Sequence, residues 1–271
     1  MRNFWLSSVL VILPLVGMCQ YENILIGPQE SGMFVYACEP SIAINPCDTN
    51  LIVAGAVLDY VYYSTDGGRT WTEQHLTSTH GVFGDPCILA TSKGDFYYFH
   101  LSDPSGNGWS DPSLLDRIVC QRSMDGGKSW SPGASIGYNG TRDQDKEWAT
   151  SSRNGRKIYV TWTQFDKYDS KLASDSSHIF FSKSNRKAEK WSKPIRINQF
   201  GGNCLDDDWA VEGAVPTVDR KGNIYVAWAL GESIYFDRSL NGGKTWMDND
   251  IVAGSITGGW RHDIPGLSRC N

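Results

Sequence analysis

The sequence predicts an all-β protein, a β-propeller assembled from four-stranded blades. Three observations carry this prediction. Glycine, tryptophan and tyrosine are abundant, a balance that favours turns and strands over a helical bundle. An octet that contains two glycines recurs along the chain, and four strand-like runs accompany each copy of it. Repeats of about 60 residues with four strands each suit the blades of a propeller.

The octets occupy residues 64–71, 123–130 and 239–246, and a divergent fourth copy lies at 182–191. Each reads as a tight turn, in which Asp or Asn bonds nearby amides, Gly takes a positive φ and Trp opens the next strand. Gly243, Lys244 and Thr245 resemble a phosphate-binding loop, but Arg238 stands where that loop needs its first glycine. We therefore expect a structural role for the octets and give nucleotide binding little weight.

Every repeat divides into four runs that alternate or concentrate apolar residues, and Asn-Pro, Lys-Gly or Asn-Gly turn signals separate the first two. The first repeat has runs at 41–45, 51–57, 60–64 and 71–75, and the second at 87–91, 95–101, 117–123 and from 130. The third has runs at 148–152, 157–165, 178–182 and 191–198, and the fourth at 214–219, 223–229, 233–239 and from 246.

The chain starts with an address rather than with a blade. Arg2 precedes an apolar stretch at 6–16 that is too short to span a bilayer, which indicates a signal peptide over 1–19 and a propeller domain over 20–271. Lipid attachment at Cys19 is disfavoured because Met18 is bulky. We expect a secreted, cell-surface or periplasmic protein without a transmembrane segment after signal removal. Cleavage would leave six cysteines, either disulfide-bonded or as buried thiols.

Composition excludes several classes of protein. With 40% hydrophobic residues, 20% charged residues and a net charge of −5, the chain can bury a core and is not basic, so we expect no nucleic-acid partner. The seven cysteines include no CxxC pair, which excludes a zinc ribbon and predicts no metal site of that kind.

The octets resemble the Asp boxes, or BNR repeats, of the sialidase (neuraminidase) superfamily, and the resemblance covers roughly residues 39–246. It implies six blades in the complete protein, with the boxes between third and fourth strands on the face away from the active site. Four blades are legible, and residues 263–267 resemble the start of a fifth. We therefore expect an N-terminal portion of a longer protein, in which residues 23–26 complete the last blade.

If the boxes lie on one face, the connections between successive repeats lie on the other, around the central channel. Each connection carries an acid just before the expected innermost strand: Glu39, Asp85, Glu147, Glu212 and Asp263. Propeller symmetry would bring these acids together, where repulsion would raise the pKa of some of them. A pair of carboxyl groups with separated pKa values is what glycoside hydrolysis needs. The alternative is that each acid satisfies the amides of its own loop.

The same loops carry side chains suited to sugar recognition by stacking and charged hydrogen bonds. These candidates are Arg142, Trp209, Trp260, Arg261 and His262. Two long connections, 102–116 and 166–177, should lie on this face and shape a site. No cofactor is required, although Asp143 with Asp145, or residues 206–208, could hold calcium; ordinary loop acidity is the alternative.

We expect an exported glycoside hydrolase of the exo-α-sialidase type or a related glycosidase, acting on a glycan or glycoconjugate, with Glu147 and Glu212 as the main catalytic candidates. The sequence departs from the sialidase pattern, because Glu39-Pro40-Ser41 stands where the first substrate-clamping arginine would fall. The arginine triad and the tyrosine nucleophile have no assignable counterparts. A non-catalytic propeller that binds glycans or proteins at the cell surface is therefore the rival, and a structural or calcium-dependent adhesion module is a third interpretation.

Overall fold

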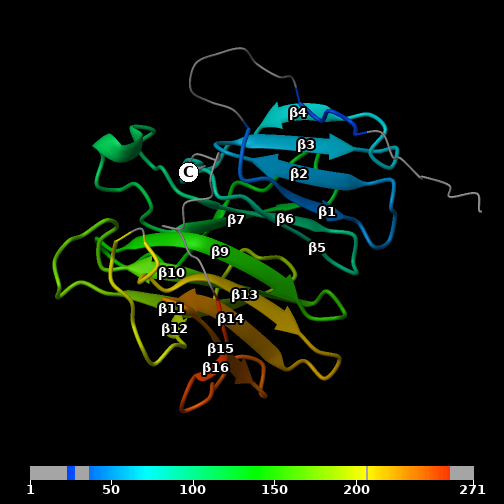
Figure 1. The fold of residues 1–271 in the computed structure, drawn as a ribbon. Helices are drawn as coiled ribbons and strands as arrows, with labels where there is room; N and C mark the ends of the chain where they lie inside the picture. Colours follow the sequence, from blue (N-terminus) through cyan, green and yellow to red (C-terminus); the bar gives the residue numbers. More distant parts are fainter. Residues whose placement is uncertain (1–22, 28–36, 206, 257–271) are drawn as a thin grey trace, which may run out of the picture.

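The computed structural model describes residues 23–27, 37–205 and 207–256 (Figure 1). This part of the chain is all-β, with four antiparallel sheets of four strands, and each sheet is a simple up-and-down meander. One short 3-10 helix, η1 (Gly108–Ser110), is the sole helix within these ranges. Within them, no helix has the length and apolar character needed to cross a membrane.

The strands follow the predicted repeats. Blade 1 holds β1 (Ser41–Ile44), β2 (Ile52–Ala56), β3 (Tyr60–Ser64) and β4 (Thr72–His75), and blade 2 holds β5 (Cys87–Ala90), β6 (Phe96–Leu101), β7 (Ile118–Ser123) and β8 (Ala134–Ile136). Blade 3 holds β9 (Asp143–Ser151), β10 (Lys157–Phe165), β11 (Ser177–Asn185) and β12 (Ile195–Arg196). Blade 4 holds β13 (Glu212–Val218), β14 (Ile224–Leu230), β15 (Ser233–Ser239) and β16 (Ile251–Ser255).

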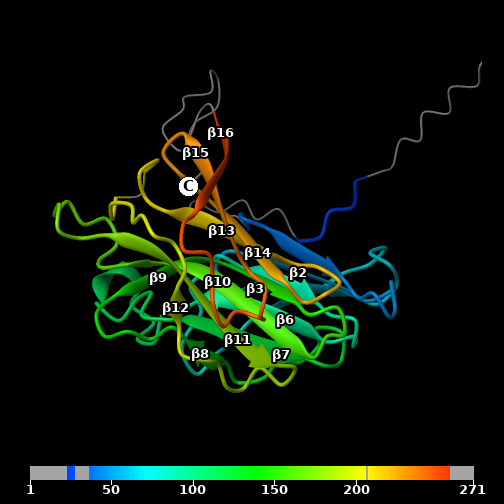
Figure 2. The same cartoon turned by 90° about the horizontal axis from the view of Figure 1, so that it is seen from below.

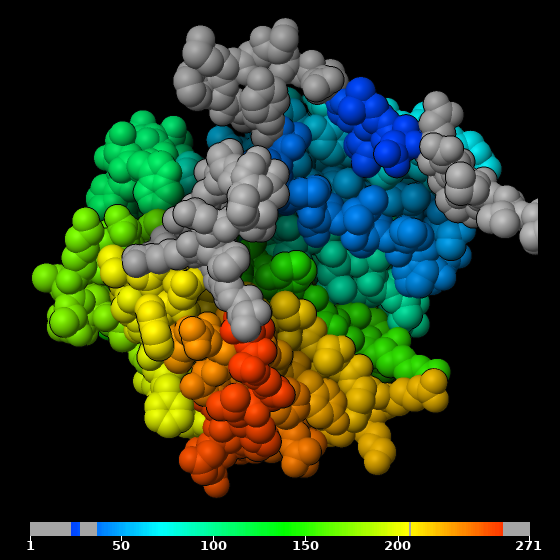
Figure 3. Space-filling view, viewed as in Figure 1, coloured from blue at the N-terminus to red at the C-terminus, as the bar shows by residue number. Residues whose placement is uncertain are grey.

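The blades are arranged as in a propeller. The first strand of each blade contacts the first strand of the next, β1 with β5, β5 with β9 and β9 with β13. These strands lie innermost, and β4, β8, β12 and β16 form the outer edges (Figures 1 and 2). The blades succeed one another in chain order around the molecule (Figure 3). The prediction of a β-propeller with four-stranded blades is confirmed.

The hydrophobic core lies between the blades, and the central strands β6 and β10 of blades 2 and 3 are buried on both faces. In β6, Phe96 and Tyr98 point into the core shared with blade 1, and Tyr97 and Phe99 point into the core shared with blade 3. A third core joins Tyr159 and its neighbours in blade 3 to blade 4. Successive side chains of a strand point to opposite faces, so one strand can serve two cores.

The Asp boxes form the predicted turns between third and fourth strands. In the first box, Asp66 Oδ1 accepts hydrogen bonds from the backbone amides of Arg69 and Thr70, both at 2.9 Å. Ser64 Oγ accepts the amide of Gly68 at 2.9 Å. These bonds hold the pKa of Asp66 down at about 2, mainly through its bonds with Thr70. The boxes of blades 2 and 4 repeat the pattern with Asp125 and Asn241 as the acceptors.

The third blade keeps the turn with different residues. Trp191 Nε1 donates to the carbonyl of Ala188 at 3.1 Å, as Trp71 Nε1 donates to that of Gly68 at 3.0 Å. Ala188 even takes the left-handed φ of 56° that glycine holds in the other boxes. The tryptophan side chain therefore belongs to the turn, and the outer strand starts after it.

The predicted strand limits need three corrections. The fourth strands of blades 2, 3 and 4 start at Ala134, Ile195 and Ile251, not at the box tryptophans. Strand β9 starts at Asp143 rather than at Trp148, because the polar run 143–147 pairs with β10 across a bulge. Residues 23–26 form no strand here, and Ile26 packs beside Ala54, Ala56 and Tyr62 of blade 1. Cys87, Cys120 and Cys204 are buried free thiols.

Candidate active site at the start of the inner strands

The face opposite the Asp boxes collects two kinds of connection. In an up-and-down blade the turns alternate between the two ends of the sheet, so the links between blades and the loops between second and third strands share one end. The long connections between β6 and β7 and between β10 and β11 lie there, as predicted. This face therefore carries the expected acids together with two long loops.

A left-handed residue occupies an equivalent position in each of the four described blades, before the inner strand in blades 1 and 2 and inside it in blades 3 and 4. These residues are Glu39, Asp85, Lys146 and Gly213, with φ of 50°, 49°, 51° and 68°. Each stands six positions before the first turn of its blade. Of the predicted acids, Glu39 and Asp85 occupy this position, whereas Glu147 and Glu212 are out of register with it. Glu147 lies one residue after the equivalent position, inside β9, and Glu212 lies one residue before it, at the start of β13.

Three of the predicted acids line one pocket of about 220 Å³ between blades 1, 2 and 3. Its lining residues are Glu39, Pro40, Ser41, Asp85, Pro86, Lys146, Glu147 and Trp148. Trp148 is 46% exposed and presents an aromatic surface beside the carboxyl groups. Carboxyl groups from separate blades thus meet at a concave site with an aromatic wall, as sugar-binding sites require.

Lys146 is the cation of this pocket. Its Nζ lies 3.0 Å from Asp85 Oδ2 and 3.9 Å from Glu39 Oε1. Burial disfavours the ammonium, but the carboxylates of Asp145 and Asp85 outweigh this effect and raise the pKa of Lys146. Lys146 is therefore charged over the physiological range and stabilises at least one negative charge beside it.

Glu39 and Asp85 have unequal environments. Burial raises the pKa of Glu39, and the charge of Asp85 and a hydrogen bond with Asp85 raise it further, while Lys146 opposes the shift. The Asp85 side chain is 17% exposed and has the shorter contact with Lys146, and that of Glu39 is 40% exposed. Glu39 is thus the acid of the pair whose proton is held more tightly than usual, and Asp85 is the acid closer to the cation.

Glu147 lies behind this pair. The side chain is buried, and neither carboxyl oxygen has a hydrogen-bond partner among the described residues. Burial and then the charge of Asp85 raise the pKa of Glu147 well above its usual range. A buried carboxyl group without partners is stable only in its neutral form, so Glu147 is a second protonated acid.

Asp145 extends the cluster toward blade 4. Asp145 is buried, and burial, the charge of Asp85 and that of Glu212 raise its pKa, whereas Lys146 lowers it. Its Oδ1 accepts the amide of Lys146 at 2.8 Å. Glu212 is buried near Asp145 but does not line the pocket. The acids therefore converge, although the two main candidates from sequence do not hold equivalent positions.

The predicted sugar-binding residues lie elsewhere or outside the described residues. Arg142 Nε donates to Asp166 Oδ1 at 2.8 Å, and neither Arg142 nor the exposed Trp209 lines the acid pocket. The predicted residues Trp260, Arg261, His262 and Asp263 lie outside the described part of the chain.

The proposed calcium ligands are engaged by protein groups. Asp143 accepts Lys167 Nζ at 2.9 Å and the amide of Tyr168 at 2.7 Å. Asp207 accepts the amide of Trp209 at 2.8 Å, and residue 206 lies outside the described ranges. No set of three or more His, Cys, Asp or Glu side chains is placed to bind a metal among the residues described.

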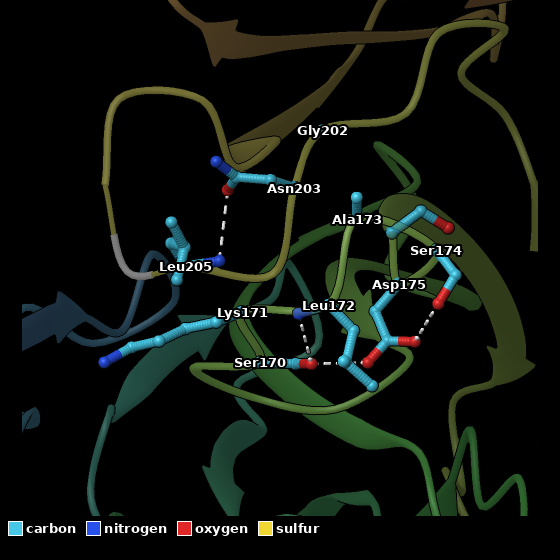
Figure 4. Close-up of a pocket in the computed structure, with 10 residues that line it drawn as sticks. Ser170, Lys171, Leu172, Ala173, Ser174, Asp175, Gly202, Asn203 and Leu205 are labelled. Atoms are coloured by element: carbon cyan, nitrogen blue, oxygen red, sulfur yellow. Dashed lines mark hydrogen bonds between the residues drawn. The ribbon is translucent and has the colours of Figure 1, made fainter.

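A larger hollow of about 420 Å³ lies between the loop 170–176 and the segment 202–205 (Figure 4). Asp175 carries the single carboxylate among the described residues that line this hollow, and it accepts hydrogen bonds from the hydroxyl of Ser170 at 2.5 Å and from that of Ser174 at 3.4 Å. A lone, hydrogen-bonded carboxylate does not offer the pair of acids that hydrolysis needs. The acid pocket is therefore the stronger candidate for chemistry.

Comparison with known proteins supports the repeat and the fold. A family model described as the BNR/Asp-box repeat matches residues 62–73, which hold the first predicted box. No curated protein matches the chain.

Among solved structures, a protein of unknown function from Dyadobacter fermentans has a TM-score of 0.56 at 18% identity, over 81% of this chain and 70% of that one. An ulvan lyase of polysaccharide lyase family 25 has a TM-score of 0.51 at 15% identity, over 81% and 59%. An α-L-arabinofuranosidase from Fusarium graminearum has a TM-score of 0.51 at 13% identity, over 77% of this chain and 65% of that one. The matched part of this chain thus spans 59% to 70% of their lengths, and identities this low show a shared propeller fold alone.

Proposed function

We propose that this protein is a glycoside hydrolase that acts at the acid pocket, with Glu39 as proton donor and Asp85 as the ionised partner. The single observation that carries the proposal is the unequal pair itself: two carboxyl groups from different blades, one with a raised pKa and one held beside Lys146. Glycan-active propellers among the similar folds, an arabinofuranosidase and an ulvan lyase, support the same class of substrate.

The chemistry needs two events at the scissile bond. The substrate must first replace the hydrogen bond that joins Glu39 to Asp85 and separate the two carboxyl groups. Glu39 then donates its proton to the glycosidic oxygen as the bond to the anomeric carbon breaks, and Asp85 either attacks that carbon or activates a water. Lys146 holds Asp85 ionised for this role. Glu147, neutral and without hydrogen-bond partners among the described residues, is a reserve proton donor directly behind the pair.

The pocket favours an uncharged sugar. The charge of Asp85 is offset by Lys146, burial favours the neutral form of Glu147, and the raised pKa of Glu39 reduces its tendency to carry a negative charge. No arginine is among the described residues that line the pocket, and a sugar carboxylate would meet Asp85 at close range. We therefore favour a neutral glycan over the sialoside that the Asp boxes first indicate, and a sialoside remains a necessary substrate in the test.

The test is turnover by the purified full chain. Fluorogenic α-L-arabinofuranoside, β-D-glucoside and sialoside substrates are assayed with the variants Glu39→Gln and Asp85→Asn. We expect loss of kcat by about 100-fold or more for each variant, as for other general acid and base residues. Glu189→Gln and Asp248→Asn are matched controls at exposed acids and should keep full activity.

Two results would overturn the assignment. Undiminished turnover in both Glu39→Gln and Asp85→Asn would remove the pair from the mechanism. Saturable glycan binding without cleavage of any substrate would favour the rival function, a non-catalytic propeller that binds glycans.

We also propose that the protein is exported, since residues 1–19 have the pattern of a signal peptide. Expression of the full chain in a secreting host, followed by N-terminal sequencing, tests this proposal. A mature start at Gln20 supports export through this signal, and retention of Met1 in a cell-associated product contradicts it.

A further inference from the structure

We infer that a second carbohydrate subsite lies beside the acid pocket, formed by the two long loops of blades 2 and 3. This inference rests on the proposed function and deepens it, because it assigns an oligosaccharide chain rather than a single terminal sugar as the ligand. The subsite is a pocket of about 310 Å³ whose walls include Trp109, Tyr168 and Lys167. None of these three residues follows from the repeat pattern.

Trp109 is the main observation. Its side chain is 66% exposed although it sits on η1 within an ordered loop. Phe83 packs edge-on against the indole with ring centroids 5.8 Å apart. The ring centroid of Tyr168 lies 5.4 Å from that of Trp109, and the two ring planes are tilted by 35°. A large aromatic side chain that is held in place yet left open to solvent commonly marks a binding surface.

Buried hydrogen bonds fix the loop that presents Trp109. Asp103 is buried, and its two carboxylate oxygens accept the amides of Gly106 and Gly108, both at 3.0 Å. These bonds anchor the loop just before Trp109, and the amide of Asp111 donates to the carbonyl of Gly108 at 3.1 Å just after it. The indole is therefore preorganised. Preorganisation lowers the entropic cost of binding.

The remaining walls offer what a sugar ring needs. Leu114 and Leu115 make an apolar floor, and Asp111 and Lys167 supply polar groups at the rim. Lys167 Nζ is neutralised by the buried Asp143 at 2.9 Å, so its donors are available without a net positive charge at the site. An aromatic face with a few hydrogen-bonding groups and little net charge suits a neutral sugar.

The two pockets lie on one strand. Asp143 at the start of β9 belongs to the subsite, and Lys146, Glu147 and Trp148 on the same strand line the acid pocket. Three residues of extended chain span about 10 Å. A short oligosaccharide can therefore occupy both pockets at once, and Trp109 would bind residues beyond the bond that is cleaved.

The first experiment measures binding without chemistry. Arabinohexaose, cellohexaose and xylohexaose are titrated by calorimetry into the Asp85→Asn protein, with and without Trp109→Ala. We expect at least a 10-fold rise in Kd with Trp109→Ala for the hexasaccharide that binds. Trp109→Phe should restore most of the affinity because it keeps the aromatic face, and Phe200→Ala, at another exposed aromatic residue, should change nothing. An unchanged Kd in Trp109→Ala, or no binding of any hexasaccharide, would overturn the inference.

The second experiment separates this inference from the proposed function. Trp109→Ala in the otherwise unchanged chain should lower kcat/KM for the hexasaccharide at least 10-fold and leave it unaltered for the aryl monoglycoside, which cannot reach the subsite. Equal losses on both substrates would contradict a distal subsite while leaving the acid pair intact. Loss of hydrolysis on every substrate with retained Trp109-dependent binding would reject the proposed hydrolase and keep the subsite.

Discussion

Arg186 of blade 3 donates two hydrogen bonds to the buried carboxylate of Asp95 in blade 2, at 2.5 and 2.9 Å. Arg122 adds a third contact to the same carboxylate at 3.0 Å. Burial disfavours the ionised form, but the two arginines hold the pKa of Asp95 below its usual range. Arg186 lies in the divergent box of blade 3 at residues 182–191, so the turn that departs from the repeat sequence contributes a link between blades.

Arg186→Ala should lower the free energy of unfolding by about 1–3 kcal/mol at pH 7, because a buried carboxylate loses two charge-assisted bonds and keeps only those from Arg122 and the Tyr97 hydroxyl. The pKa of Asp95 is lowered in the folded state, so the lost stabilisation applies above the unfolded pKa of about 3.8 and vanishes as the pH falls through the folded value. Urea unfolding at pH 7 measures the loss of stability, and urea unfolding at pH 3 measures how far this loss diminishes at low pH. Arg220→Ala, at an exposed arginine, is the control, and equal losses for the two variants would refute the role of the pair.

Gly127→Ala should destabilise the fold by about 3 kcal/mol. A Cβ at this box glycine would lie 2.6 Å from Val53 Cγ2 of the neighbouring blade, and its φ of 90° is strained for alanine. Gly222→Ala is a matched control, since its φ is 87° and no atom lies within 4 Å of the added Cβ. The control should cost about 1 kcal/mol. Thermal unfolding compares the variants, and similar drops in Tm would mean that the contact between blades is unimportant.

Glu147→Gln should stabilise the protein at alkaline pH. The raised pKa of Glu147 means that the folded state holds a proton that the unfolded state releases, so wild-type stability falls as the pH rises above about 4.5. Glutamine cannot ionise and escapes this loss. We expect a gain of at least about 1 kcal/mol at pH 8 and none at pH 4, measured by urea unfolding. A pH-independent difference, or the same gain with Glu189→Gln, would contradict it.

Lys146→Met should raise the pKa of the carboxyl groups around it. The ammonium lowers the pKa of Glu39, Glu147 and Asp145 through its charge, so its removal leaves these acids protonated to higher pH. Carbon-13 NMR titration of the side-chain carboxyl groups measures the shift directly. Lys193→Met, at an exposed lysine, should leave all three titrations in place. If the proposed hydrolysis is established, the alkaline limb of kcat/KM, which follows the proton donor Glu39, should move upward in Lys146→Met as well.

The sequence allowed most of the strand pattern to be predicted because the octets mark the same turn in each blade. The predicted starts of the outer strands were too early because a box tryptophan resembles a strand residue. In the structure, Trp71 and Trp191 instead donate hydrogen bonds from Nε1 to carbonyl groups of the turn. Strand β9 was shortened for the opposite reason. Its first residues are acidic and look like a loop, yet Asp143 and Asp145 pair with β10 in the folded chain.

The sequence predicted that acidic residues would gather at this site, but not which residues hold equivalent positions in blades 3 and 4. Aligning the blades on their acids selects Glu147 and Glu212, whereas aligning them on the first turn selects Lys146 and Gly213. That second alignment was available from sequence and would have found the lysine. Trp109 could not be found in this way, because it lies in a loop without a counterpart in the other blades. Only the tertiary contact with Tyr168 indicates a role for it.

Strand β6 belongs to two cores at once, with Phe96 and Tyr98 on one side and Tyr97 and Phe99 on the other. Blade 2 therefore cannot unfold independently, because its unfolding would expose apolar residues of blades 1 and 3 to solvent. Although the sequence is modular, the described blades should denature together, and hydrogen exchange in β2, β6 and β10 should report one common opening reaction.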